Sequence, residues 1–400
     1  MDISLYQNVN SSNSRQLSRI YKSCNNNSTS LESVINCMYN IEKVKYNVEK
    51  VKYFNTDNIN NQTGEGVFVW QGIAKYINNL LLIVGTSDPG ANTGQGIIYI
   101  GDITCNGGEI VQMSVPTAQY TSVYGPRYDS TTDLFTFVGS YTLENDSYTL
   151  ENDSNIYGFL YRGKLDKLSI ANINNYILQM NYSSSAYTTT FTHSTDGDFA
   201  VGNSGSTSEK DTFSWLYNIN NKSYTPIIYP DSKTTTTYGI VHNNNGSYTI
   251  VGGYSTSRQI GITEIYNANG VALPIQYAYI ADFVYNDNSQ AITFKNWTTI
   301  QYKNNYLTHI EGISSTNNPN VYTLAADVIG INNKTTGFFL TLERKNNTFI
   351  SSNWTPIDYG NGSSINEKGL TTSNSVVDNK IVGLFVSSTT TEAFQAIINL

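Results

Sequence analysis

A pair of glycines recurs along this 400-residue sequence at a nearly fixed spacing, and it restricts the chain to repetitive β folds. The first glycine lies in one predicted strand, and 13 or 14 residues later the second one follows an apolar residue in the next strand. The clearest copy, Tyr238–Tyr266, predicts three short antiparallel strands: one with Gly239 that ends in a polar turn, then Tyr248–Tyr254, then Ile262–Tyr266. Such self-similarity is the signature of repeat architectures.

Six units of this kind can be counted from residue 66 onward. Their second strands read LLLIVGTS, LFTFVGSY, DFAVGNS, YTIVGGYS, VYTLAAD and KIVGLFV. The third strands alternate aromatic or aliphatic with polar residues, as half-buried strands do. Four units have both glycines: Gly72 with Gly85, Gly125 with Gly139, Gly239 with Gly252, and Gly369 with Gly383. In a diverged fifth unit, Gly312 is followed by Ala326 in place of the second glycine. In the remaining unit the second glycine is Gly202, and Thr189–Phe191 stands where the first glycine is expected. Less regular fourth strands are visible at Val111–Val115, Tyr224–Tyr229 and Thr348–Trp354.

The residues before the repeats predict a separate N-terminal segment, 1–48. Residues 1–29 are polar and rich in Asn and Ser, which is typical of an arm outside a core. From Leu31 to Ile41 the apolar residues recur at helical spacing behind Ser30, a suitable N-cap, and predict one amphipathic helix. The next stretch, EKVKYNVEKVKYF, suits a helix or a strand, and we favour a strand over Glu49–Phe54.

Six four-stranded units around a common axis make a six-bladed β-propeller, and this all-β fold is our prediction. The sequence ends inside the third strand of the sixth unit, so the strand at Glu49–Phe54 is expected to complete that blade and cover its open edge. Tyr277–Trp297 reads as an added hairpin in the fourth unit, and a β-solenoid or two β-sandwich domains are the alternative folds. The predicted propeller spans 49–400, with units at about 66–116, 117–181, 182–230, 231–300, 301–357 and 358–400.

The second and third strands resemble a known family of repeats. IVGGYS, FVGSYT followed by YGFLYRG, and IVGTS followed by GIIYIG are similar to the HAF-type probable extracellular repeat, in which a Val-Val-Gly strand precedes an aromatic strand. The resemblance covers about residues 66–400, and the Ala-Phe pair of that family's third strand occurs only at Ala393–Phe394. It implies propeller-like β-repeats and assigns no functional residue.

Charge and composition argue against several classes of function. The formal net charge is −8 and no long run of Lys and Arg occurs, so nucleic acid is not an expected partner. No apolar stretch is long enough to span a bilayer, and the first residues lack the layout of a secretory signal, which favours cytosolic synthesis or export without such a signal. Cys24, Cys37 and Cys105 suit neither a disulfide framework nor a zinc site. Enrichment in Asn, Ile, Lys and Tyr is typical of AT-rich genomes.

The candidate binding residues lie near the ends of the first strands, which line the central channel of a propeller. His193 and His242 stand just before turns, and with His309 they could bring three imidazoles to a metal. We favour the alternative, in which two are turn residues and His309 pairs with Glu311, so no metal or other cofactor is predicted. The side chains expected to rim the channel mouth are Tyr124, Arg127, His193, His242 and Glu311.

Signatures of enzymes are incomplete in this sequence. HSTDGDF at His193–Phe199 nearly matches the Asp-box turn of sialidase-type propellers, but the other units lack it and the arginines (Arg127, Arg162, Arg258, Arg344) are scattered. Glycoside hydrolysis needs two facing carboxylates, and no spacing selects a pair from Asp88, Glu264, Asp282, Glu311 and Asp327. There is no G-x-S-x-G elbow, P-loop or dinucleotide fingerprint. A non-catalytic role is favoured.

Aromatic residues are the most informative population for function. The 31 Tyr and 4 Trp suit surfaces for sugars or protein partners, with filling of the blade interfaces as the structural alternative. We predict a non-catalytic propeller that serves as a binding or structural component of a larger assembly, such as a viral particle or a surface layer, with a protein partner or copies of itself. The alternative is a carbohydrate-binding or carbohydrate-active propeller, a lectin or a glycosidase-like protein.

Overall fold

The computed structural model of the chain describes residues 51–56, 67–87, 94–143, 156–167, 177–180, 189–205, 212–243, 245–256, 277–303, 307–329, 335–359, 370–387 and 391–400. The chain divides into a compact unit, Tyr53–Ile397, and a second unit of Met1–Lys52 with Ile398–Leu400. The predicted arm and the predicted helix at Leu31–Ile41 lie outside the described residues. In the part of the chain that is described, no helix has the length and apolar character needed to cross a membrane.

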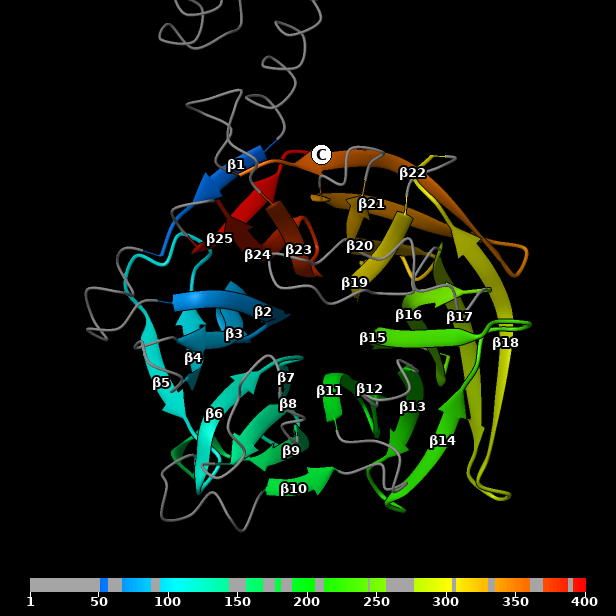
Figure 1. The fold of residues 1–400 in the computed structure, drawn as a ribbon, viewed down its shortest axis with the longest axis horizontal. Coiled ribbons are helices and arrows are strands. Elements are labelled where there is room, and N and C mark those ends of the chain that lie inside the picture. Colours follow the sequence, from blue (N-terminus) through cyan, green and yellow to red (C-terminus); the bar gives the residue numbers. More distant parts are fainter. Residues whose placement is uncertain are drawn as a thin grey trace, which may run out of the picture. The chain divides into compact units, whose positions relative to one another are not determined.

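Six antiparallel sheets form a ring, which confirms the six-bladed β-propeller (Figure 1). Each sheet is one blade, and the blades follow one another in chain order. Blade one holds β2 (Val67–Lys75), β3 (Leu81–Ser87), β4 (Gln95–Gly101) and β5 (Glu109–Met113). Blade two holds β6 (Ala118–Val123), β7 (Arg127–Asp129), β8 (Leu134–Leu143), β9 (Tyr157–Gly163) and β10 (Ile177–Met180). Blade three holds β11 (Thr189–Asp196), β12 (Phe199–Gly205), β13 (Thr212–Asn218) and β14 (Ser223–Ile227). Blade four holds β15 (Thr234–His242), β16 (Ser247–Ser255), β17 (Tyr277–Asn286) and β18 (Ala291–Ile300). Blade five holds β19 (Leu307–Ser315), β20 (Val321–Ile329), β21 (Thr335–Lys345) and β22 (Thr348–Ile357). Blade six holds β23 (Leu370–Val377), β24 (Lys380–Val386), β25 (Thr391–Ile398) and β1 (Val51–Phe54). Short 3-10 turns lie at Ile77–Asn79 and Leu165–Lys167.

Burial along the strands explains their sequence patterns. All residues of β3 and β16, the second strands of blades one and four, are buried, because neighbouring blades cover both faces of the sheet there. The outermost strand β18 alternates exposed and half-buried residues over most of its length. The core therefore lies between adjacent blades, where Trp70 and Trp215 are fully buried.

The predicted closing strand is confirmed. In blade six the hydrogen-bonded order is β1, β25, β24, β23, so the N-terminal strand takes the outer place that the C-terminal strands leave open. The Tyr53 ring packs edge-on against Phe394, with ring centroids 6.0 Å apart, and the Asp358 backbone N–H donates to the Tyr53 hydroxyl at 2.9 Å. Pairing this edge removes a surface that would otherwise recruit foreign strands.

The predicted third strand of the fourth unit is wrong. The strand that pairs with β16 is β17, in the register Tyr248 opposite Phe283, and β18 pairs with β17 as the fourth strand. The stretch Tyr277–Trp297 is therefore part of the regular blade and not an added hairpin. Ile262–Tyr266 lies outside the described residues. An apolar, aromatic alternation occurs in both stretches, and only the pairing with β16 distinguishes between them.

Candidate binding site in the central channel

A bulge in the inner strands builds the centre of the channel. In five blades the pairing of the first and second strands shifts by one residue, and a bulge re-aims the side chain at that point. In blade two the inner strand is instead interrupted between β6 and β7. The six residues at these places, which we call the channel ring, all line one cavity: Gln71, Tyr124, His193, Tyr238, Glu311 and Asn374.

Small residues directly after the channel ring let the inner strands approach one another. A Cβ on Gly125 would lie 2.5 Å from the Ser194 Cα, and one on Gly312 would lie 3.0 Å from the Ser375 Cα. Ser194 and Ser375 therefore take the glycine position in blades three and six, and not Thr189–Phe191 and Gly369 as predicted. The Gly125 N–H donates to the His193 carbonyl at 3.0 Å, which holds blades two and three together at this level.

Four side chains of the channel are stacked or bonded in series. The His193 ring stacks on Tyr238 with centroids 4.0 Å apart, and His309 meets Tyr238 edge-on at 4.5 Å. His309 Nδ1 contacts the Glu311 carboxylate, and its Nε2 lies 3.2 Å from the Thr236 hydroxyl. The orientation of Glu311 is therefore set by His309, which also packs against the Tyr238 ring.

Burial sets the charge states in this part of the channel. Loss of hydration, with a smaller effect of His309, lowers the pKa of His193 to about 3, so its imidazole is neutral at physiological pH. Burial also raises the pKa of Tyr238. The pKa of Asp327 is raised well above its ordinary value by burial first and by the Glu311 carboxylate second. A second negative charge beside Glu311 is therefore disfavoured.

Three neutral side chains of the channel ring have unused hydrogen-bonding groups. Among the described residues, the Gln71 amide, the His193 imidazole and the Tyr238 hydroxyl form no hydrogen bond. All three line both of the cavities that meet at the channel ring. The three side chains are half-buried and line the two cavities, so these groups are accessible to a ligand.

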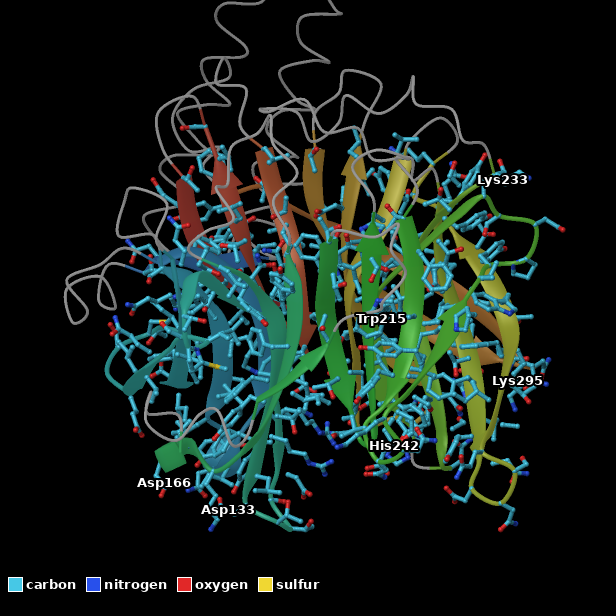
Figure 2. All side chains as sticks on the ribbon, turned by 60° about the horizontal axis from the view of Figure 1, so that its bottom comes forward. Asp133, Asp166, Trp215, Lys233, His242 and Lys295 are labelled. Carbon is cyan, nitrogen blue, oxygen red and sulfur yellow. The ribbon has the colours of Figure 1, made fainter. Side chains whose placement is uncertain are left out.

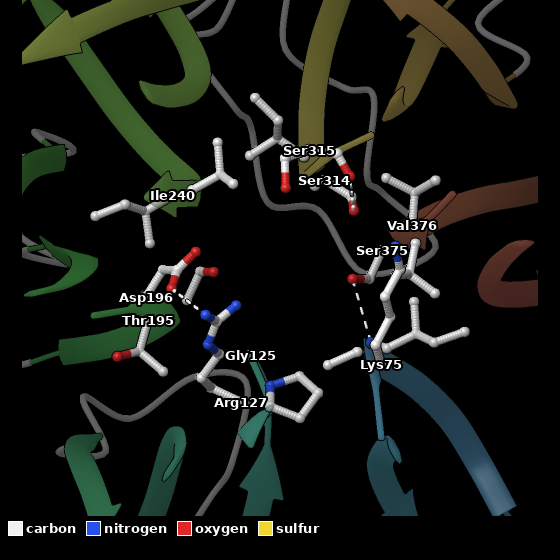
Figure 3. Close-up of a pocket in the computed structure, with 18 of the residues that line it drawn as sticks. Lys75, Gly125, Arg127, Thr195, Asp196, Ile240, Ser314, Ser315, Ser375 and Val376 are labelled. Atoms are coloured by element: carbon white, nitrogen blue, oxygen red, sulfur yellow. Dashed lines mark hydrogen bonds and ion pairs between the residues drawn. The ribbon is translucent and has the colours of Figure 1, made fainter. Parts of the chain in front are cut away.

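The larger cavity, which we call the Arg127 cavity, opens where the inner strands end and has a volume of about 410 Å³. Arg127 projects into it and pairs with Asp196, with Nη2 and Oδ1 3.2 Å apart (Figure 3). Asp196 also accepts a hydrogen bond from the His242 N–H at 2.8 Å. Hydroxyl-bearing residues complete the wall: Ser130, Ser194, Thr195, Ser314, Ser315 and Ser375.

The second cavity, which we call the Phe191 cavity, lies on the other side of the channel ring, where the inner strands begin. Its volume is about 310 Å³. Four aromatic rings contribute to its wall: those of Tyr124, Phe191, His193 and Tyr238. Phe191 stacks on His193 with centroids 6.0 Å apart, and Tyr124 lies 5.5 Å from the same imidazole.

The five residues predicted to rim the channel occupy three different places. Tyr124, His193 and Glu311 belong to the channel ring, deeper than a rim, and Arg127 lies in the larger cavity. His242 lines neither cavity: it lies at the far end of β15 and packs on Tyr248, with centroids 4.6 Å apart (Figure 2). The expected equivalence of His193 and His242 is wrong, because Tyr238 is the residue that matches His193 in register.

Sequence reasoning missed Gln71, Tyr238 and Asn374. A signal for two of them existed, since Gln71 and Tyr238 directly precede the repeated first glycine, as Tyr124 and Glu311 do. No such glycine follows Asn374, whose amide donates to the Trp70 carbonyl at 2.6 Å.

Other candidate groups are structural or isolated. Within the described residues, no cluster of three His, Cys, Asp or Glu side chains has the geometry of a metal site. Asp282 is buried and pairs with Arg344 at 2.6 Å, and Asp88 and Glu264 lie outside the described residues. Burial raises the pKa of Cys105 to about 12, which leaves an inert thiol.

Comparisons with known proteins concern the fold alone. No family model matches the chain. No curated protein sequence matches it either. Among solved structures, it is similar to a Pseudomonas aeruginosa periplasmic gluconolactonase (9% identity, 78% of this chain and 80% of that chain, TM-score 0.40). It is also similar to Trypanosoma rangeli sialidase in complex with sialic acid (5% identity, 83% of this chain, TM-score 0.49), of whose chain it spans 54%. A third similar structure is Kuenenia stuttgartiensis hydrazine synthase (9% identity, 80% and 77%, TM-score 0.39).

Proposed function

We propose that this propeller is a binding protein that holds a small, neutral, polyhydroxylated ligand, such as a sugar, in the Arg127 cavity. The observation that carries the proposal is a set of three neutral polar groups on the channel ring that have no hydrogen-bond partner among the described residues: the Gln71 amide, the His193 imidazole and the Tyr238 hydroxyl. Each of these groups both donates and accepts hydrogen bonds, as a sugar hydroxyl does. A ligand with uncharged hydroxyl groups can therefore form hydrogen bonds with all three groups.

The charges around the Arg127 cavity support a neutral ligand. Among the described residues, the charged side chains in its wall have partners: Lys75 pairs with Asp378 at 2.8 Å, Arg127 pairs with Asp196, and Glu311 contacts the His309 imidazole. An anionic ligand at Lys75 or Arg127 would have to compete with these carboxylates. A neutral ligand can use the hydroxyl groups and the free atoms of the channel ring without breaking a pair.

Glycan binding by the full-length chain tests the proposal. A glycan array and calorimetric titration with neutral mono- and disaccharides should show saturable binding, and Gln71→Ala or His193→Ala should weaken it at least about tenfold, because each removes groups that the ligand needs. His242→Ala is the matched control, since His242 lines neither cavity. Absence of saturable binding, or an equal loss with His242→Ala, would overturn the proposal.

The assembly role predicted from the sequence is the competing proposal, and the same samples distinguish the two. Light scattering of the purified chain gives its mass in solution. A large, regular oligomer without glycan binding supports the assembly role. A monomer with saturable glycan binding supports the channel as the functional site.

A further inference from the structure

The Phe191 cavity differs in chemistry from the Arg127 cavity, although the two share five residues of the channel ring. Aromatic rings form much of its wall, and the other polar groups there are largely used within the protein. Asn203 bonds the Thr237 backbone, and the Ser204 hydroxyl accepts from the Trp215 indole N–H at 3.1 Å. Beyond the Gln71 amide, which it shares with the Arg127 cavity, this cavity therefore offers a ligand chiefly aromatic surface.

Among the described residues, the charged side chain that lines the Phe191 cavity is Glu311, whose carboxylate also contacts the His309 imidazole. Among the described residues of its wall there is no Lys or Arg. The imidazole in the wall, His193, is neutral at physiological pH. Burial first and the Glu311 carboxylate second raise the pKa of the nearby Asp327, so a further negative charge is disfavoured there. The local field thus favours positive charge.

We infer that the Phe191 cavity binds an organic ammonium group, with the cation against the aromatic rings of Tyr124 and Phe191 and within reach of the Glu311 carboxylate. Aromatic faces attract alkylammonium ions through the ring quadrupole, and a nearby carboxylate adds charge complementarity. The volume of about 310 Å³ is in the range of small-molecule sites. The inference does not depend on the proposed function, because it concerns the opposite side of the channel ring and a different ligand.

Two ligands of the same shape separate charge recognition from apolar burial. Choline carries a trimethylammonium group, and 3,3-dimethylbutan-1-ol has the same outline without the charge. In calorimetric titrations of the full-length chain, choline should bind saturably and the uncharged alcohol should bind about tenfold more weakly or not at all. Equal affinities would mean an apolar pocket only and would overturn the inference, as would the absence of choline binding.

Two substitutions locate the site. Glu311→Gln keeps the shape of the side chain and removes its charge, and should weaken choline binding about tenfold or more. Phe191→Ala removes a half-buried ring outside the core and should weaken it severalfold, while circular dichroism and the unfolding temperature report that the fold is kept. His242→Ala should leave the affinity unchanged. Choline binding that neither Glu311→Gln nor Phe191→Ala weakens would place the ligand elsewhere and refute the inference.

Discussion

Asn203 joins blade three to blade four, and its substitution tests how the ring is held together. Its side-chain oxygen accepts from the Thr237 N–H at 2.9 Å, and its side-chain nitrogen donates to the Thr237 carbonyl at 3.3 Å. Thr237 is fully buried, so its two backbone groups have little access to water. Asn203→Leu keeps the approximate volume and leaves both backbone groups of Thr237 without these partners.

The size of the effect follows from the two orphaned groups. An unpaired buried donor or acceptor costs about 1–3 kcal/mol, so the free energy of unfolding should fall by about 2–4 kcal/mol after partial relaxation. A domain has a total stability of about 5–15 kcal/mol, and urea unfolding followed by circular dichroism resolves such a loss easily.

The control is Asn317→Leu, because Asn317 is an exposed asparagine without a hydrogen bond among the described residues. It should change the stability by no more than about 0.5 kcal/mol. A loss below about 1 kcal/mol in Asn203→Leu, with an unchanged urea slope, would refute the reasoning that these two bonds hold blades three and four together.

Three further measurements test the buried charges. The pKa of Asp327 is raised in the folded state, so its contribution to stability is intact at low pH and is lost as the pH rises through the raised pKa. Asp327→Asn keeps the acceptor for the Ser373 N–H and should therefore gain thermal stability relative to the wild type more at high pH than at low pH. An equal difference at both pH values would contradict this. The His193 ring protons should keep their neutral chemical shifts in NMR titrations from neutral pH to about pH 4, since its pKa is lowered to about 3, and a midpoint near 6.5 would contradict the burial of the ring. Arg344→Met leaves Asp282 buried without its ion pair, so chemical denaturation should show a loss of about 3–5 kcal/mol. Adding Asp282→Asn should recover part of it, and additive losses would mean that the two side chains do not interact.

The part of the fold that the sequence predicts rests on local patterns. Period-two alternation in the strands and the repeated Gly pair depend on neighbouring residues only, so six blades of four strands could be predicted, and the missing strand of the last blade led to β1. The third strand of blade four could not be identified in this way, because Ile262–Tyr266 and β17 carry similar patterns. The choice depends on which stretch hydrogen-bonds to β16, and that is a long-range contact.

The candidate site depended on tertiary structure much more. The sequence contains the residues of the channel ring, and a glycine follows four of them, but a bulge shifts the side-chain alternation by one residue and leaves no reliable mark on the pattern around it. The pairing of Arg127 with Asp196, the position of His242 outside both cavities, and the meeting of Gln71, His193 and Tyr238 arise only when blades far apart in sequence surround one axis. Strand content is therefore determined by the local sequence, whereas the chemistry of the channel is determined by the closure of the ring.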